Sequence, residues 1–443
     1  MSSRSSVHIL VLGDITRSPR IKNHAKSFAL EGWRVKFSGY SGSQPDTDED
    51  IEYCYLNEPP PCLDALPRIL SLPLKWLFLS ICLLVHLILH MKEDILLVQS
   101  PPAAPTFSVI HSFAFFKGCP VCIDWHNYGY TILSATSHRQ TFTASIYKFM
   151  EISFAAWFFN PKSFLRTSHF TVSEALKEDL LRQTGIDATV VYDRPTNEFK
   201  PTSLEDAHNL FTRLSQTYPQ LRNLSGSTEG TVFTEASGSP EDRPALVVSG
   251  CSWTPDDDFT VMIEALDIYN TVVASSPNIH YHKLICIVTG KGPLKAHFQA
   301  MIAGRKWEHV EVLTPWLEWN DYLLLLGSAD LGVSLHHSTS NLDLPMKVVD
   351  LLGAEVPVLA LAYPALSELL PDGQLGYHFR TPNELANYLE QLLMPKEDFQ
   401  GVGDSLDLIR LKRNIHTLKQ STDMSWHTHW CSTVLPVCRQ LVS

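Results

Sequence analysis

The chain has 443 residues, more than a single hydrophobic core usually supports, so we expect two domains. The formal net charge of -12, from 35 Lys and Arg against 47 Asp and Glu, offers no electrostatic basis for binding a polyphosphate backbone. Nucleic acid is therefore excluded as an expected partner. The nine cysteines are scattered and odd in number, which fits a reducing compartment better than a disulfide framework.

Short apolar runs alternate with helical patterns in the first part of the chain, which predicts a parallel, doubly wound α/β domain over residues 1–200. The expected strands are Val7 to Leu12, Val35 to Phe37, Ile95 to Val98, Val121 to Asp124, Phe170 to Val172 and Thr189 to Val191. The first helix is the best marked, with Ser18 as the expected cap, Pro19 at the first helical position and Gly32 at its end.

The turn after the first strand combines Gly13, Asp14, Arg17, Ser18 and Arg20 with the start of that helix. Backbone N–H groups, the helix dipole and two arginines then converge on one place, which indicates a diphosphate site. The turn is not a G-x-G-x-x-G, which counts against a dehydrogenase. Ordinary surface charge is the alternative interpretation of the two arginines.

The run Asp124-Trp125-His126-Asn127-Tyr128-Gly129-Tyr130 ends a strand with a carboxylate, an imidazole and several aromatics. A general base must take the proton from an attacking sugar hydroxyl, and histidine titrates near neutral pH. We expect His126 to be that base, with Asp124 either orienting it or acting as the base itself. A structural histidine at a strand end is the alternative.

Residues 69–90 are the most apolar stretch, long enough to span a bilayer but interrupted by Pro73, Lys75 and His86. A crossing there would cut the first domain in two, so we expect a helix that lies in the membrane interface. Residues 1–6 run straight into the first strand, and we expect no cleaved secretory signal.

Composition marks the other domain boundaries. Residues 201–244 contain a segment rich in Ser, Gly, Thr and Pro and are expected to form a linker with a flexible insertion. The βα alternation then resumes over residues 245–420, which predicts a second doubly wound domain, a fold that binds nucleotides at its strand ends. Residues 421–443 are expected to form a helix that packs back on the first domain.

Strand ends of the second domain carry residues suited to a nucleotide diphosphate. Lys347 lies in the first turn of a helix that follows Ser338 and Ser340, and Asp350, one turn later, is placed to accept ribose hydroxyls. A capped surface helix is the alternative interpretation. The other candidate donor-binding residues are Ser252, Lys291, Thr314 and Trp316.

The triplet Asp256-Asp257-Asp258 precedes a helical pattern, and we interpret it as a helix N-terminus in preference to a metal site. No metal ligands are assigned anywhere in the chain.

With these motifs in view, the chain resembles the chitobiosyldiphosphodolichol β-mannosyltransferase family over nearly its whole length. The matching motifs are Leu12-Gly13-Asp14, Arg17-Ser18-Pro19-Arg20, Gln99-Ser100-Pro101-Pro102, Asp124 to Tyr130, Ser252-Trp253-Thr254, Thr289-Gly290-Lys291-Gly292-Pro293-Leu294, Thr314-Pro315-Trp316-Leu317, Gly327 to Val333 and Leu342 to Asp350.

The resemblance implies a GT-B fold, in which two Rossmann-like domains face each other across a cleft. It also implies transfer of mannose from GDP-mannose to a dolichol-diphosphate-linked chitobiose, with inversion and without an essential metal or other cofactor. The expected location is the cytosolic face of the endoplasmic reticulum membrane. Other dolichol-pathway mannosyltransferases, or a second copy of the chain, are expected as protein partners.

The sequence departs from the family in two places. Related transferases often carry a Lys or Arg pair after the first strand of the second domain, where this chain has Cys251-Ser252-Trp253, so charge neutralisation is expected from Lys291 or Lys347. Members commonly begin with a membrane anchor, which is missing before Val7, so attachment is expected from residues 69–90 and from aromatic side chains. The aromatic residues concerned are Phe142, Phe149, Trp157 and Phe158. Packing in the core of the domain is the alternative interpretation.

Two rival functions remain open at this level. One is a GT-B transferase that uses another nucleotide sugar, since the strand-end turns do not by themselves distinguish guanine from other bases. The other is a non-catalytic paralogue retained as a partner subunit in an endoplasmic-reticulum transferase complex.

Overall fold

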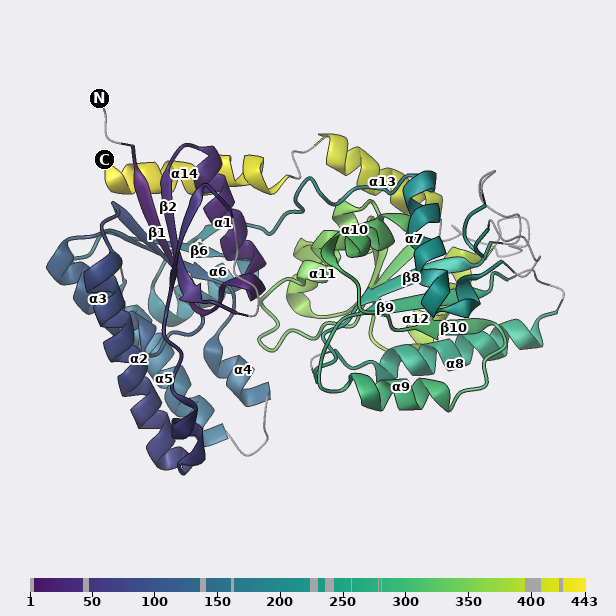
Figure 1. The fold of residues 1–443 in the computed structure, drawn as a ribbon, viewed down its shortest axis with the longest axis horizontal. Coiled ribbons are helices and arrows are strands. Elements are labelled where there is room, and N and C mark those ends of the chain that lie inside the picture. Colours follow the sequence, from purple (N-terminus) through teal and green to yellow (C-terminus); the bar gives the residue numbers. More distant parts are fainter. Residues whose placement is uncertain are drawn as a thin grey trace. The chain divides into compact units, whose positions relative to one another are not determined.

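The computed structural model describes residues 4–42, 48–135, 141–160, 163–223, 230–235, 243–255, 257–277, 279, 281–394, 408–421 and 425–443. Two compact units divide the chain (Figure 1). Unit 1 comprises Met1–Asp193 and Trp426–Ser443, and unit 2 comprises Arg194–Ser425. The last helix of the chain therefore belongs with the first domain.

Unit 1 is built on a seven-stranded sheet in the order β3-β2-β1-β4-β5-β6-β7, with every pairing parallel. Its strands are β1 (Ser6–Asp14), β2 (Arg34–Tyr40), β3 (Ile51–Tyr55), β4 (Ile95–Ser100), β5 (Val121–Trp125), β6 (Thr167–Thr171) and β7 (Thr189–Val190). The strand order reverses between β1 and β4, and ligands of open parallel sheets bind at such a switch point, beyond the carboxyl ends of the strands.

Seven α-helices of unit 1 are described: α1 (Pro19–Leu30), α2 (Arg68–His90), α3 (Thr106–Lys117), α4 (Gly129–Ala135), α5 (Thr141–Phe158), α6 (Glu174–Thr184) and α14 (Trp426–Val442). Two short 3-10 helices, η1 (Ile15–Arg17) and η2 (Pro61–Ala65), precede α1 and α2. Helix α14 packs along α1, although the two lie at opposite ends of the chain (Figure 1). Buried Trp426 and Trp430 of α14 join the core formed by Phe28 and the strands.

Unit 2 repeats the architecture with a six-stranded parallel sheet in the order β10-β9-β8-β11-β12-β13. Its strands are β8 (Ala245–Gly250), β9 (Leu284–Thr289), β10 (Val310–Leu313), β11 (Leu331–Ser334), β12 (Val358–Leu361) and β13 (Gly376–Phe379). Its helices are α7 (Leu204–Thr217), η3 (Pro219–Leu221), α8 (Thr260–Ser275), α9 (Lys295–Ala303), α10 (Trp319–Ser328), α11 (Met346–Gly353), η4 (Pro364–Glu368), α12 (Pro382–Leu393) and α13 (Leu408–Ser421). The switch point lies between β8 and β11.

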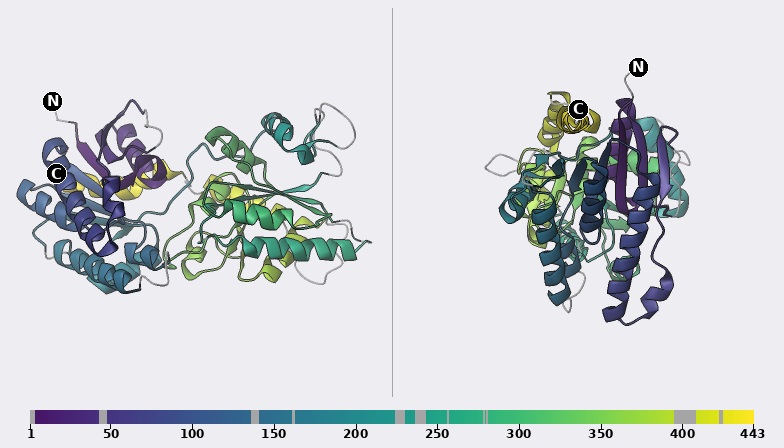
Figure 2. Two further views of the ribbon diagram at one scale, coloured as in Figure 1. Left: turned by 60° about the horizontal axis from the view of Figure 1, so that its bottom comes forward. Right: turned by 90° about the vertical axis from the view of Figure 1, so that its left-hand side faces the viewer.

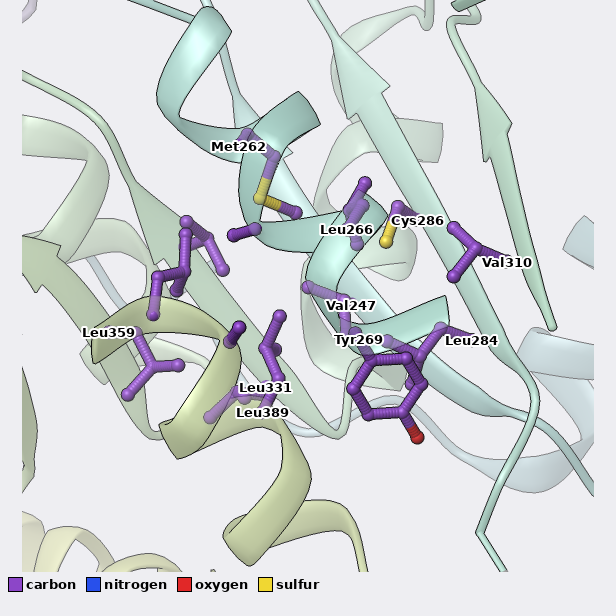
Figure 3. Close-up of a cluster of buried hydrophobic side chains, with 14 of the residues drawn as sticks. Val247, Met262, Leu266, Tyr269, Leu284, Cys286, Val310, Leu331, Leu359 and Leu389 are labelled. Atoms are coloured by element: carbon purple, nitrogen blue, oxygen red, sulfur yellow. The ribbon is translucent and has the colours of Figure 1, made fainter. Parts of the chain in front are cut away.

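The core of unit 2 lies between this sheet and helices α8 and α12 (Figure 3). Met262, Leu266 and Tyr269 of α8 and Leu389 of α12 pack on strand residues such as Val247. Strand residues and one helix face are apolar, as expected for a sheet covered by amphipathic helices.

The two parallel Rossmann-like sheets confirm the α/β fold class predicted from the sequence. The segment between them differs from the prediction. Within residues 201–244 the chain forms α7, which Ser203 caps by accepting the Asp206 N–H, and η3, so this part is folded into unit 2 and is not a linker. The Ser- and Gly-rich stretches 224–229 and 236–242 lie outside the described residues.

Candidate active site

Asp124 is the centre of a buried polar cluster at the carboxyl end of β5. Its carboxylate has no exposed surface and accepts hydrogen bonds from Arg20 Nε and Nη2, each at 2.9 Å, and from His126 Nε2 at 2.7 Å. Burial works to raise its pKa, but the Arg20 guanidinium and His126 outweigh burial and hold the pKa of Asp124 well below its usual range. Asp124 therefore stays ionised and orients its neighbours, because a carboxylate with so low a pKa is a poor base.

His126 is the partly exposed end of this cluster, with 22% of its side chain accessible. Its backbone N–H donates to Ser100 O of β4 at 2.8 Å, which fixes the residue next to the switch point. Since the ionised Asp124 can only accept, Nε2 carries the proton and Nδ1 is left as the basic nitrogen. The pair has the carboxylate–imidazole geometry of a general base with its orienting group.

Arg20 does not take the predicted role at a diphosphate. It is 3% exposed, and all three guanidinium nitrogens are engaged inside unit 1. Besides its two bonds to Asp124, Nη1 donates to Val191 O at 2.8 Å and to Asp193 Oδ1 at 2.9 Å. The prediction was wrong because two buried carboxylates neutralise the Arg20 guanidinium, and four hydrogen bonds hold it inside unit 1.

The rest of the predicted anion turn stays at the surface. Arg17 is 85% exposed, with Nε 3.5 Å from Asp14 Oδ2. Asp14 caps η1 by accepting from Thr16 N at 2.8 Å. Ser18 makes no side-chain cap on α1, contrary to prediction, because its hydroxyl donates to Asp14 O at 3.2 Å. Gly13 lies on β1 beside this turn.

The cluster extends to the C-terminal helix α14, which packs on unit 1 as predicted, but its contact with this cluster was not predicted. Trp430 Nε1 of α14 donates to His24 Nδ1 at 2.9 Å, and His24 Nε2 lies 3.3 Å from Asp124 Oδ2. Because an indole N–H only donates, Nδ1 of His24 is unprotonated and its Nε2–H faces the carboxylate. Burial lowers the pKa of His24 and keeps it neutral. His24 lies one helical turn after Arg20, and this i, i+4 spacing could have predicted that the two side chains share one face of α1.

In unit 2, Lys347 at the start of α11 pairs with buried Asp257. Burial acts to raise the pKa of Asp257, but the Lys347 ammonium and two hydrogen bonds from Ser252 lower it below its usual range. A Cβ on Gly250, at the end of β8, would lie 3.7 Å from Lys347 Cγ, so the lysine stem runs along the switch point.

The aspartate triplet does not act as one helix cap. Asp257 turns to Lys347 and Ser252, whereas Asp258 Oδ1 accepts from Thr260 N at 3.0 Å at the start of α8. Asp256 lies outside the described residues. No local pattern predicts the Asp257–Lys347 pair, because the residues are ninety positions apart.

The loops after β9 and β10 bring together Lys291 and Trp316. Lys291 Nζ lies 3.7 Å from the centre of the Trp316 ring, a cation–π contact at a half-exposed indole. Glycines flank Lys291 for a packing reason: a Cβ at Gly290 or Gly292 would lie 1.8 or 1.9 Å from the carbonyl oxygens of Cys251 and Ser252.

The remaining candidate donor residues make contacts within unit 2. Ser338 is fully buried and donates to Asp343, so, contrary to prediction, its hydroxyl is not presented to a ligand. Ser340 Oγ accepts from Leu342 N at 3.1 Å and shapes the same loop. Thr314 Oγ1 accepts from Gln299 Nε2 at 2.8 Å, and Asp350 Oδ2 accepts from Tyr322 OH at 3.2 Å.

Comparison with known proteins places these features in a family. A family model described as "Glycosyl transferase-like" matches residues 292–420. The chain is 36% identical over 445 residues to the chitobiosyldiphosphodolichol beta-mannosyltransferase of Mus musculus, covering 97% of this chain and 88% of the relative. The chain belongs to the chitobiosyldiphosphodolichol beta-mannosyltransferase family.

Two further comparisons agree with this result, one on the class of enzyme and one on the fold. An Arabidopsis thaliana relative named UDP-glycosyltransferase TURAN is 35% identical and covers 100% of this chain and 99% of its own. A glycosyltransferase structure from Rickettsia africae matches with a TM-score of 0.63 at 13% identity, over 100% of both chains. The family member described here is thus a glycosyltransferase with the predicted GT-B fold.

Proposed function

We propose that this chain transfers mannose from GDP-mannose to the terminal N-acetylglucosamine of a dolichol-diphosphate-linked chitobiose, forming a β-1,4 linkage early in the synthesis of the lipid-linked oligosaccharide for N-glycosylation. The observation that carries the proposal is the His126–Asp124 pair at the switch point of unit 1, in a chain of this family. Such a pair suits the activation of a sugar hydroxyl.

The reaction then proceeds as a single displacement. Nδ1 of His126 takes the proton of the acceptor hydroxyl while the hydroxyl oxygen forms a bond to the anomeric carbon of mannose. The bond from that carbon to the GDP oxygen breaks, and GDP leaves with the bonding electrons. Attack from the opposite face inverts the anomeric centre. Asp124 stabilises the imidazolium that forms, since its charge lies 2.7 Å from Nε2.

Positive groups of unit 2 support the departure of GDP. Lys347, in the first turn of α11, and Lys291, at the end of β9, supply cations close to parallel strand ends. Asp257 offsets part of the Lys347 charge, so Lys347 alone does not neutralise a diphosphate. The helix dipole and the free backbone N–H groups at the amino end of α11 supply the rest of the positive potential. We propose that these groups neutralise the leaving diphosphate without an essential metal, and that Arg17, not Arg20, meets the lipid diphosphate.

We also propose that unit 1 binds the cytosolic face of the endoplasmic reticulum membrane through α2. Among the described helices, Leu70–His90 of α2 alone is long and apolar enough to span a bilayer, and it is mostly unburied. Leu72, Leu77 and Ile81 are each more than half exposed. Figures 1 and 2 show the first half of α2 projecting beyond the sheet of unit 1.

The second half of α2 is held by the domain, which favours a helix in the interface over one that spans. Leu83 and Leu87 are buried, and His86 Nε2 bonds to Ser38 Oγ of β2 at 2.8 Å. Pulling α2 across a bilayer would break these contacts. Leu72→Glu with Leu77→Glu should abolish co-sedimentation with anionic vesicles, and unchanged co-sedimentation would contradict the assignment.

The direct test supplies purified enzyme with GDP-mannose and a lipid-linked chitobiose. The expected product is a trisaccharide lipid that β-mannosidase, and not α-mannosidase, returns to the disaccharide. Absence of product under detergent-optimised conditions, with GDP-mannose still bound, would favour the non-catalytic paralogue. EDTA should leave the initial rate unchanged.

The name of the Arabidopsis relative favours a second candidate, a transferase that uses a UDP-sugar. A thermal-shift comparison separates the two, because a ligand at one hundred times its dissociation constant stabilises a protein by about 2.7 kcal/mol. A larger shift with GDP than with UDP supports the mannosyl donor, and the reverse order supports the rival.

A further inference from the structure

Three side chains with metal-binding atoms meet where α14 packs on α1, outside the candidate active site. Glu31 is the residue that ends α1, and His427 and Cys431 lie one turn apart on the same face of α14. Cys431 Sγ lies 3.5 Å from Glu31 Oε1 and 3.6 Å from His427 Nε2, and His427 Nε2 lies 3.7 Å from Glu31 Oε1.

These three separations fit the edges of a zinc tetrahedron. With ordinary Zn–S, Zn–N and Zn–O bond lengths and tetrahedral angles, ligand atoms lie about 3.3 to 3.6 Å apart. Each observed separation is within a few tenths of an ångström of that range, so one ion can reach all three atoms after small side-chain movements. The three residues are partly exposed, which gives an ion an entry path and leaves a fourth position for water.

Neighbouring groups are placed to orient the ligands. His427 Nδ1 lies 3.2 Å from Ser27 Oγ, and when Nδ1 donates this hydrogen bond, Nε2 carries the lone pair that faces Cys431 and Glu31. Arg439 Nη2 donates to the other oxygen of Glu31 at 3.3 Å and leaves Oε1 for the ion. Both contacts are of the kind that supports metal ligands in proteins.

We propose that Glu31, His427 and Cys431 bind Zn²⁺, with a water as the fourth ligand, and that the ion fastens the C-terminal helix to α1. A thiolate and an imidazole select zinc over magnesium or calcium, which prefer oxygen ligands alone. The site takes no part in the transfer reaction. Its effect is on stability, because α1 carries Arg20 and His24 and α14 carries Trp430.

Zinc binding at this site releases a proton to solvent. The ion binds the thiolate form of Cys431, so the thiol proton leaves when the Zn–S bond forms. When Co²⁺ replaces zinc, the thiolate contributes a sulfur-to-metal charge-transfer band.

The test uses the full chain without a histidine tag, stripped with EDTA and dialysed. Addition of Zn²⁺ is expected to load about one ion per chain and, at one hundred times the dissociation constant, to raise the melting temperature of unit 1 by about 5 to 10 °C. Mg²⁺ is expected to give no shift. Cys431→Ser should abolish both zinc effects, whereas Cys62→Ser, at an exposed cysteine of η2, should abolish neither.

Wild-type protein alone can overturn the proposal. Failure to retain zinc against a weak chromophoric chelator, or a Co²⁺ complex without a thiolate charge-transfer band, would show that the three side chains form only a polar contact. Equal zinc loading of the wild type and the Cys431→Ser variant would do the same. Should that variant fold poorly, His427→Gln repeats the comparison, and its metal-free melting temperature reports its folding.

Discussion

Replacement of Arg20 by methionine keeps most of the side-chain volume but removes the guanidinium that Asp124 and Asp193 share. Both carboxylates then remain buried without their cation, and breaking a buried ion pair in this way costs about 3 to 5 kcal/mol. For a domain of this size, each kcal/mol corresponds to about 2 to 4 °C in melting temperature. We expect Arg20→Met to lower the melting temperature of unit 1 by about 6 to 20 °C.

Arg17→Met is the matched control, three residues earlier and almost fully exposed. A surface substitution is expected to change stability by less than about 0.5 kcal/mol, so its melting temperature should stay within about 2 °C of the wild type. Arg17→Met should instead raise KM for the lipid acceptor. Thermal unfolding by circular dichroism, with steady-state kinetics in parallel, measures both. A stable Arg20→Met protein with a selectively raised acceptor KM would refute the structural role assigned to Arg20.

Three further predictions follow from the described contacts. Burial raises the pKa of Glu151 to about 7 from 4.5, so this carboxyl should make unit 1 less stable by ~3 kcal/mol as pH rises through that window. Glu151→Gln should make the melting temperature nearly independent of pH between these values. A variant whose melting temperature depends on pH as the wild type's does would contradict the assignment. With Lys347→Met, at least about ten times more GDP should be needed to give the same thermal shift. An unaltered GDP titration would exclude Lys347 from the donor site. Trp430→Phe removes the indole donor to His24 and should lower kcat about tenfold with little change in KM. A rise in KM alone would show that Trp430 does not act through the Asp124 cluster.

Most of the fold was predictable because buried parallel strands leave a strong signal. The apolar runs at Val7, Ile95 and Val121 all became strands of the unit 1 sheet. The sequence analysis missed β3, a short strand at one edge of the unit 1 sheet with polar residues among its apolar ones. Edge strands are half-covered, so they do not need the continuous apolar run that marks a central strand.

The candidate site was predictable only where it is local in sequence. Strand-end motifs brought Asp124 and His126 to notice, because carboxyl ends of parallel strands meet at one edge of a sheet. The burial of Arg20 was not predictable, since its partner Asp193 is far away in the chain. The contact between His24 and Trp430 joins residues 406 positions apart and depends on the packing of α14.

The single-turnover rate of His126→Ala, at saturating GDP-mannose and lipid-linked chitobiose, tests the proposed reaction most directly. Because the Arg20–Asp124 pair remains intact, the variant should stay folded, and thermal unfolding by circular dichroism checks this. The rate should fall at least about a hundredfold, as expected for loss of a general base. A folded variant that turns over at a near-normal rate would show that the proton of the acceptor hydroxyl goes elsewhere.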